Sequence, residues 1–294
     1  MKKIGLSSYS ISRAIAAGEF DILGAVDWIA ENGGEHIEIV PSGCFKLQSA
    51  ADPLAAAIRK RAGEKGIEIS SYTIGANLIT AGEDGHDSTA EECAAEIERL
   101  KREVDIAAAL GVRFMRHDAG WRPMDRCGIE QFERDLPKAA DACGQIADYA
   151  ARYGITTSVE NHGYFFQGSE RVHRLVAMVG RDNFRTTLDV GNFNCVDEDS
   201  VSATMNNISI ASMIHFKDFY IRDEVPTMGG WFKSLHGRCL RGAITGCGDL
   251  NLRKVTEIIR NSSYDGFISV EYEGMEECKL GSKISLENVK ALFA

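Results

Sequence analysis

The sequence lacks the features of a nucleic-acid-binding or membrane protein. Its 294 residues include 33 Lys and Arg against 43 Asp and Glu, which gives a net charge of −10. Because phosphate backbones are bound mainly by Lys and Arg, this charge argues against nucleic acids and anionic membranes as main partners. There is also no run of 18 apolar residues, so no transmembrane helix is predicted.

The sequence also lacks a cysteine framework. None of the eight cysteines forms a Cys-x-x-Cys pair, so we expect reduced thiols rather than disulfides or a structural zinc site. The chain begins with two lysines, but serines and Arg13 interrupt the following segment, unlike the apolar core of a signal peptide. Together these features predict a cytoplasmic protein.

A dinucleotide-binding loop is missing too, because GLSSYS stands where Gly-x-Gly-x-x-Gly would follow the first strand. What the sequence does contain is a regular alternation of β-like and helical segments. The eight β-like segments span residues 3–8, 36–40, 67–74, 112–117, 155–160, 184–189, 211–216 and 266–273. Such alternation predicts the α/β class, and eight units in this length predict a (β/α)₈ TIM barrel forming one domain over residues 1–294. A doubly wound open sheet is the alternative.

Several helix boundaries can be predicted from local signals. Ser88 and Glu91 have capping-box spacing at the start of the helix expected over 88–111. Pro137 is expected to kink or restart the helix expected over 130–154. Glycines at the helix ends indicate left-handed C-caps.

The longest insertion runs from Asp218 to Leu250 and is expected to form a loop. Basic residues and glycines are mixed in it, so it could bind a phosphate or carboxylate, or simply be solvated. The basic residues are Arg222, Lys233, His236, Arg238 and Arg241.

Polar side chains gather at the ends of the last four predicted strands. Glu160, Asp189 and His215 end three of them, and Glu271 lies near the end of the eighth. In a closed barrel these ends meet at one rim, where active sites of this fold lie. Three carboxylates there would repel one another unless a cation were bound, so we predict that these four residues bind one divalent metal ion. Mixed oxygen and nitrogen ligands favour Mn²⁺, with Mg²⁺, Co²⁺, Fe²⁺ and Zn²⁺ as alternatives.

Other candidates near this rim have two open interpretations. His117 ends the fourth strand and His162 follows Glu160, so each could bind substrate hydroxyls or be structural. Trp121 lies in a loop after a strand, where it could cover a sugar face or pack the loop. Glu273 shares a strand face with Glu271, but Glu271 is expected to lie nearer the barrel interior.

Four segments carry a family resemblance, namely SVENHG, TTLDVGNF, MIHFKD and GCGDLNLRKVTEIIRNSSYDGFISVEYEG. They resemble the xylose-isomerase-like TIM-barrel superfamily of sugar phosphate isomerases and epimerases, which also contains the endonuclease IV branch. The resemblance implies that Glu160 and Glu271 act as acid and base on a small carbohydrate through an enediolate. It also implies that Arg222 binds substrate, and it leaves open whether the chain forms a homo-oligomer.

The sequence departs from the family pattern at two places. Asn192 stands where the family often has a His, which argues against a second metal and against a role beside the ligands. Phe166 and Gln167 occupy the region of a further Glu found in the 3-epimerases. The alternatives are therefore a lyase similar to inosose dehydratases, a barrel subunit without independent turnover and, least favoured, a DNA-repair phosphodiesterase.

Overall fold

A closed eight-stranded barrel forms the centre of the structure, a computed structural model that describes residues 2–41, 43–82, 85–226 and 229–294. All neighbouring strands of the barrel are parallel, which confirms the predicted TIM barrel. In ring order the strands are β1 (Lys3–Ser7), β13 (Phe267–Val270), β9 (Ala211–Phe216), β8 (Phe184–Asp189), β7 (Thr156–Glu160), β6 (Phe114–His117), β3 (Glu68–Ile74) and β2 (His36–Ile39).

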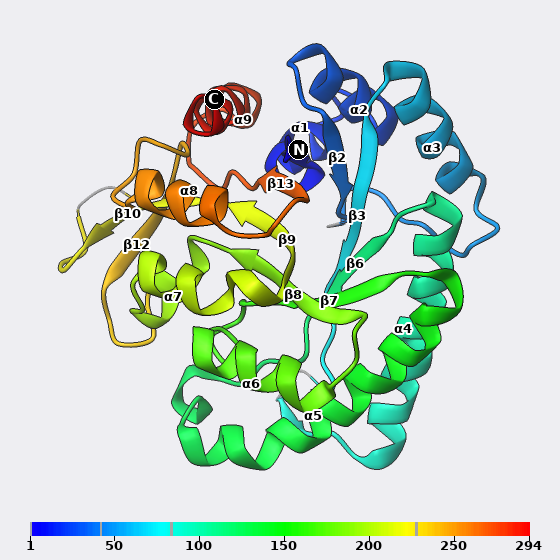
Figure 1. Cartoon of the computed structure of the whole chain (residues 1–294), viewed down its shortest axis with the longest axis vertical. Helices are drawn as coiled ribbons and strands as arrows, with labels where there is room; N and C mark the ends of the chain where they lie inside the picture. Colours follow the sequence, from blue (N-terminus) through cyan, green and yellow to red (C-terminus); the bar gives the residue numbers. More distant parts are fainter. Residues whose placement is uncertain (1, 42, 83–84, 227–228) are drawn as a thin grey trace.

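Helices surround this barrel on its outside (Figure 1). A short helix, α1 (Ser12–Ala16), follows β1 and was not predicted. The longer helices are α2 (Ile22–Glu31), α3 (Pro53–Lys65), α4 (Ala90–Leu110), α5 (Ile129–Ala150), α6 (Ser169–Val179), α7 (Ser200–Asn207), α8 (Leu252–Asn261) and α9 (Cys278–Phe293). No helix among the described residues is long and apolar enough to cross a membrane.

The two faces of the barrel strands differ in polarity. Outward-facing residues such as Ile37, Leu188 and Ile214 are fully buried against the helices and form the apolar core. The inward-facing residues at mid-height include several with hydroxyl groups, and Ser158 Oγ lies 2.8 Å from Thr187 Oγ1. Ser269, beside His215 in the strand register, is equally buried. The barrel interior is therefore polar below the rim.

Glycines end several helices at the opposite face of the barrel. Gly66, Gly111 and Gly180 are C-caps with φ values of 71°, 78° and 60°. The predicted left-handed caps are therefore confirmed at these positions.

The start of α4 corrects one prediction. The capping box is formed by Thr89 and Glu92 rather than by Ser88 and Glu91. Both pairs have the required spacing, but Ser88 Oγ accepts a hydrogen bond from Lys138 Nζ at 2.8 Å and is engaged elsewhere. The tertiary contact therefore decides between two pairs that the local sequence makes equivalent.

We expect Thr89→Ala to lower the free energy of unfolding by about 1 kcal/mol, because it removes the acceptor for the Glu92 N–H. Glu91→Ala, at an exposed position, should change it by less than about 0.5 kcal/mol. Urea denaturation of both variants measures this, and a larger loss for Glu91→Ala would refute the assignment.

Two further expectations are corrected. Of the two effects expected of Pro137, a kink or a restart of the helix, the restart is wrong, because α5 runs continuously through Pro137. Its ring lies on the exposed side of α5, where water can bind the carbonyl that loses its partner, while the opposite face is packed in the core. The insertion expected as a loop contains a three-stranded antiparallel sheet of β10 (Asp218–Arg222), β12 (Cys239–Ala243) and β11 (Phe232–Lys233).

Candidate metal centre

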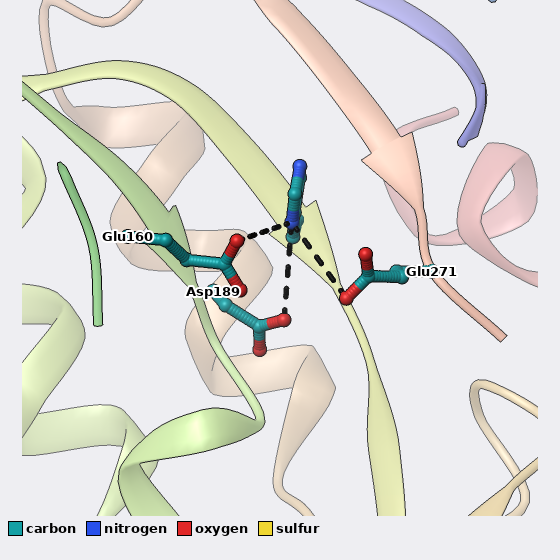
Figure 2. Close-up of side chains that lie close together, drawn as sticks. Glu160, Asp189 and Glu271 are labelled. Atoms are coloured by element: carbon teal, nitrogen blue, oxygen red, sulfur yellow. Dashed lines mark ion pairs between the residues drawn. The ribbon is translucent and has the colours of Figure 1, made fainter. Parts of the chain in front are cut away.

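The predicted ligands lie together at the carboxyl ends of four neighbouring strands. Glu160, Asp189, His215 and Glu271 are buried, and each offers one atom within 4.8 Å of those of the others. Figure 2 shows the three carboxylates pointing toward the same imidazole nitrogen. His215 Nδ1 lies 3.6 Å from Glu160 Oε2, 3.8 Å from Glu271 Oε2 and 4.0 Å from Asp189 Oδ2.

Two buried atoms of this cluster support a metal. His215 Nδ1 has no hydrogen-bond partner among the described residues. Asp189 Oδ2 likewise accepts no hydrogen bond there, although Lys217 Nζ lies 3.4 Å from it. A buried polar atom without a protein partner calls for another one, such as a bound ion. A divalent cation between one imidazole and three carboxylates would satisfy both atoms.

The other ring nitrogen of His215 is held by a carboxylate from β2. His215 Nε2 lies 3.1 Å from Glu38 Oε1, and Thr73 Oγ1 donates a hydrogen bond to the same oxygen. All three side chains are buried. A carboxylate that accepts the Nε2–H fixes the tautomer in which Nδ1 is free to bind a metal. Glu38 therefore orients the candidate ligand without being one.

Replacing Glu38 with Gln should weaken metal binding by about 10–100-fold, because the amide cannot fix the His215 tautomer as a carboxylate does. Competition with a coloured chelator measures the affinity. Glu103→Gln is a matched control, since Glu103 binds the Tyr72 hydroxyl on the outside of the barrel. Unchanged affinity in Glu38→Gln would contradict the role given to Glu38.

A buried guanidinium and an amide hold the carboxylate of Glu160. Arg116 Nε lies 2.9 Å from Glu160 Oε2, and Arg116 also pairs with Asp118 at 2.7 Å. Asn192 Nδ2 donates to Glu160 Oε1 at 2.9 Å. The expectation that Asn192 would have no role beside the ligands is therefore wrong, because it contacts one of them directly.

A buried ammonium lies on the other side of the cluster. Lys217 Nζ is 2.7 Å from Glu271 Oε2 and 3.2 Å from Glu273 Oε2. Its side chain is 3% exposed. Since residues two apart share a strand face, Lys217 follows His215 toward the barrel mouth. Glu271 is the less exposed of the two glutamates and belongs to the cluster, whereas Glu273 lies at its edge.

These cations give the two glutamates different acidities in the metal-free site. Burial would raise the pKa of Glu160, but Arg116 and His215 outweigh it and hold the pKa well below its usual value. Burial raises the pKa of Glu271 to about 7 despite the opposing charges of Lys217 and His215. Burial would lower the pKa of Lys217, but the surrounding carboxylates keep it well above its usual value. Lys217 is therefore an ammonium.

The remaining predicted residues lie at different distances from the cluster. His117 does not face the barrel interior, because its neighbour Arg116 does, and its ring lies 6.1 Å from that of Phe184 on the outward side. His162 lies at the mouth with Nδ1 3.5 Å from Asp118 Oδ1. Trp121 lines a cavity together with His162 and is 42% exposed.

The structure does not bring Arg222 to the cluster. Its side chain is 49% exposed at the end of β10, and its guanidinium pairs with Asp249 at 2.6 Å. The other basic residues of the insertion have separate partners, such as Asp197 for His236. In the described part of the insertion, therefore, no convergent anion site is formed.

Phe166 and Gln167, which occupy the region where the 3-epimerases have a further Glu, make structural contacts. Gln167 Nε2 donates to the Asn192 carbonyl at 2.6 Å, and Phe166 packs edge-to-face on Phe132 and Phe165. Asn161 turns away from the cluster and binds the backbone of Asp189 through both ends of its amide. These contacts fix the loops that carry Glu160, Asp189 and Asn192.

Sequence analysis missed Glu38, Arg116 and Lys217 as parts of the site. Each is a charged residue at an inward position near the end of a barrel strand, which is the signal that could have found them. Lys217 continues the period of two from His215, and Glu38 and Arg116 precede the ends of β2 and β6 by one residue.

Comparison with solved structures places the fold among known barrels. The probable 3-DHS dehydratase AsbF from Bacillus anthracis is 15% identical with a TM-score of 0.74, and 99% of each chain is covered. A D-psicose 3-epimerase crystallised with D-fructose is 16% identical with a TM-score of 0.70, again over 99% of each chain. The 3-keto-D-glucoside 4-epimerase YcjR from E. coli is 16% identical with a TM-score of 0.71 over 99% of this chain and 100% of that one.

A search of curated protein sequences finds no significant match. The family model described as xylose isomerase-like TIM barrel matches residues 26–292. Because this match spans most of the chain and includes all four candidate ligands, the chain belongs to the xylose isomerase-like TIM barrel family.

Proposed function

We propose that the chain is a divalent-metal-dependent isomerase or epimerase that acts next to the carbonyl group of a sugar or sugar-like polyol. The observation that carries the proposal is the convergence of Glu160, Asp189, His215 and Glu271 with an unpartnered, buried His215 Nδ1. A manganese ion is the leading candidate for this site. The structural neighbours include two sugar epimerases and a probable dehydratase, which supports the same class of chemistry.

A bound divalent cation supplies positive charge that polarises a carbonyl and its neighbouring hydroxyl. The chain's own residues then remove and return the proton on the carbon that carries this hydroxyl. One glutamate removes it to leave an enediolate, and the other returns a proton from the opposite side. Glu160 faces a guanidinium that cannot lose a proton, so it remains a carboxylate, the form that can accept one.

Glu271 is suited to the donating step. Its pKa of about 7 in the metal-free site lets it carry a proton near neutral pH, and the Lys217 ammonium 2.7 Å away can stabilise negative charge that develops on a substrate oxygen. Burial of both side chains keeps water away from these groups and strengthens their electrostatic effect.

The Lys217–Glu271 pair also favours a second candidate. An ammonium 2.7 Å from the carboxylate provides two neighbouring acids, and protonation of a leaving hydroxide would turn the same enediolate chemistry into elimination of water. The second candidate is therefore a lyase of the inosose-dehydratase kind. Both candidates need the same metal ligands and differ only in where the second proton goes.

Incubation of the Mn²⁺-loaded protein with keto- and aldo-sugars and with cyclic polyol ketones in D₂O separates these candidates. An isomerase or epimerase introduces deuterium at a carbon next to the carbonyl, which NMR detects. A lyase produces a diketone that has lost water. With metal bound, failure of every compound to exchange or lose water would overturn both and favour a barrel subunit without independent turnover.

A further inference from the structure

A cavity of about 370 Å³ opens beside the metal centre, between the loops that follow β3, β6 and β7. None of the proposed catalytic steps uses it. Most of its lining is apolar or glycine, and its polar side chains include Asp118 and His162. The apolar and glycine part consists of Ala76, Gly120, Trp121, Pro123, Met124, Gly163 and Tyr164.

The polar end of this cavity is connected to the metal centre. His162 Nδ1 lies 3.5 Å from Asp118, Asp118 pairs with Arg116 at 2.7 Å, and Arg116 lies 2.9 Å from Glu160. Because Asp118 belongs to the lining, one side chain, that of Arg116, separates the cavity wall from a proposed catalytic carboxylate. A molecule that reacts at Glu160 could extend into the cavity without leaving the barrel mouth.

At the apolar end of the cavity, two large apolar side chains are exposed to solvent. Trp121 and Met124 are each 42% exposed, although both line the cavity. Their loop is fixed by Arg122, whose side chain is 1% exposed and pairs with Asp135 at 2.7 Å. On the facing loop Tyr164 has a positive φ of 65°, which is uncommon for a residue other than glycine. The cavity is therefore preformed by anchored loops.

The charges in the lining indicate a neutral occupant. The Arg122 guanidinium is the one permanent cation among the described residues of the lining, and it is already paired with Asp87 at 2.5 Å and with Asp135. Asp118 is in turn neutralised by Arg116. The Arg122 guanidinium is therefore already engaged, and His162 has the Asp118 carboxylate as its charge partner at 3.5 Å. An indole face, in contrast, suits the apolar face of a ring.

We propose that the cavity is a subsite for a neutral ring substituent, which packs its apolar face against Trp121 while the keto-sugar part of the substrate reaches the metal centre. The substrate class is then a glycoside, with either a second sugar ring or an aryl group in the subsite. His162 lies where it can donate or accept a hydrogen bond at the junction of the two parts. This inference rests on the proposed function for the reacting part of the substrate.

The test compares the binding of methyl β-D-glucopyranoside, phenyl β-D-glucopyranoside and cellobiose to the Mn²⁺-loaded protein by calorimetry. Phenyl glucoside and cellobiose, which carry a second ring, should bind at least about tenfold more tightly than the methyl glucoside. This is the gain expected for stacking of that ring on an indole. Preference for phenyl alone identifies an aryl subsite, and preference for cellobiose alone identifies a sugar subsite. Equal affinities, or no binding of any probe, would overturn the proposal.

Variants of residues that line the cavity test whether the preference for probes with a second ring arises there. Trp121→Ala should reduce it to less than about twofold, and Met124→Ala should weaken it in the same direction if Trp121→Ala fails to fold. Trp231→Ala is the matched control, since the Trp231 ring stacks on Arg241 at 4.8 Å and does not line the cavity. A preference that survives in folded Trp121→Ala would refute the subsite.

The two proposals can fail separately. Exchange of deuterium into unsubstituted sugars without any ring preference would overturn the subsite and leave the proposed function standing. A ring preference that Trp121→Ala abolishes, in a protein that neither binds Mn²⁺ nor exchanges protons, would support the subsite and overturn the proposed function.

Discussion

The Asp189→Asn variant is expected to lose metal binding and activity almost completely. Asp189 Oδ1 already accepts hydrogen bonds from the backbone N–H groups of Gly191 and Asn192 at 2.7 and 2.9 Å. Only Oδ2 is left for a metal, and in the variant the amide group that replaces it carries two protons and no charge. Affinity should therefore fall by more than the about 10–100-fold loss typical of residues that merely orient ligands.

Elemental analysis of protein dialysed against Mn²⁺ measures this loss, with the deuterium-exchange assay run in parallel. Asp249→Asn is a matched control, because Asp249 is a surface carboxylate paired with Arg222. The control should retain one metal per chain, as should the unaltered protein. Full metal content in Asp189→Asn would refute the candidate metal centre.

The Lys217→Met variant is expected to keep the metal but lose most activity and, without metal, much stability. Removing the ammonium leaves Glu271, Asp189 and Glu273 without the cation that faces them. Breaking a buried ion pair in this way costs about 3–5 kcal/mol, so the metal-free variant should unfold at much lower denaturant concentration. Bound Mn²⁺ should restore most of this loss, because it supplies positive charge to two of the same carboxylates.

Activity should fall by about 100–1,000-fold even in the metal-loaded variant, the usual effect of removing one group that stabilises developing charge. Urea denaturation with and without Mn²⁺ gives the stability, and the exchange assay gives the rate. Lys254→Met serves as control, since Lys254 pairs with Glu257 on the surface of α8. Full activity in Lys217→Met would eliminate Lys217 from the mechanism, and equal stability without metal would contradict its electrostatic role.

The barrel could be predicted from the sequence because its signals are periodic and repeated. Each unit has an apolar strand followed by a helix, and any single boundary error leaves the count of eight intact. The candidate ligands followed from the same logic, since Glu160, Asp189 and His215 end their strands. The wrong predictions concerned local features that hydrophobic periodicity does not indicate. The insertion was expected as a loop because its glycines hide the pairing of β10 with β12.

The partners of the ligands were harder to predict. Glu38 contacts His215 although 177 residues separate them, so nothing local in either segment indicates the pair. Arg116 was overlooked because a charged residue in a short strand usually faces solvent, and only closure of the barrel buries it beside Glu160. The capping box of α4 could not be assigned locally either, since the contact from Lys138 decides it.

Because the barrel interior is polar, different residues of each strand serve packing and chemistry. Packing depends on the outward residues of each strand, and chemistry depends on the inward ones. Mutations at Ser158, Thr187 or Ser269 can therefore remodel the floor of the site while the contacts between strands and helices stay as they are. A solved structure that is 15% identical over 99% of this chain still has this fold, with a TM-score of 0.74. A library confined to these three hydroxyl positions, which leaves the buried charges near the rim unchanged, would explore new substrates at little risk to folding.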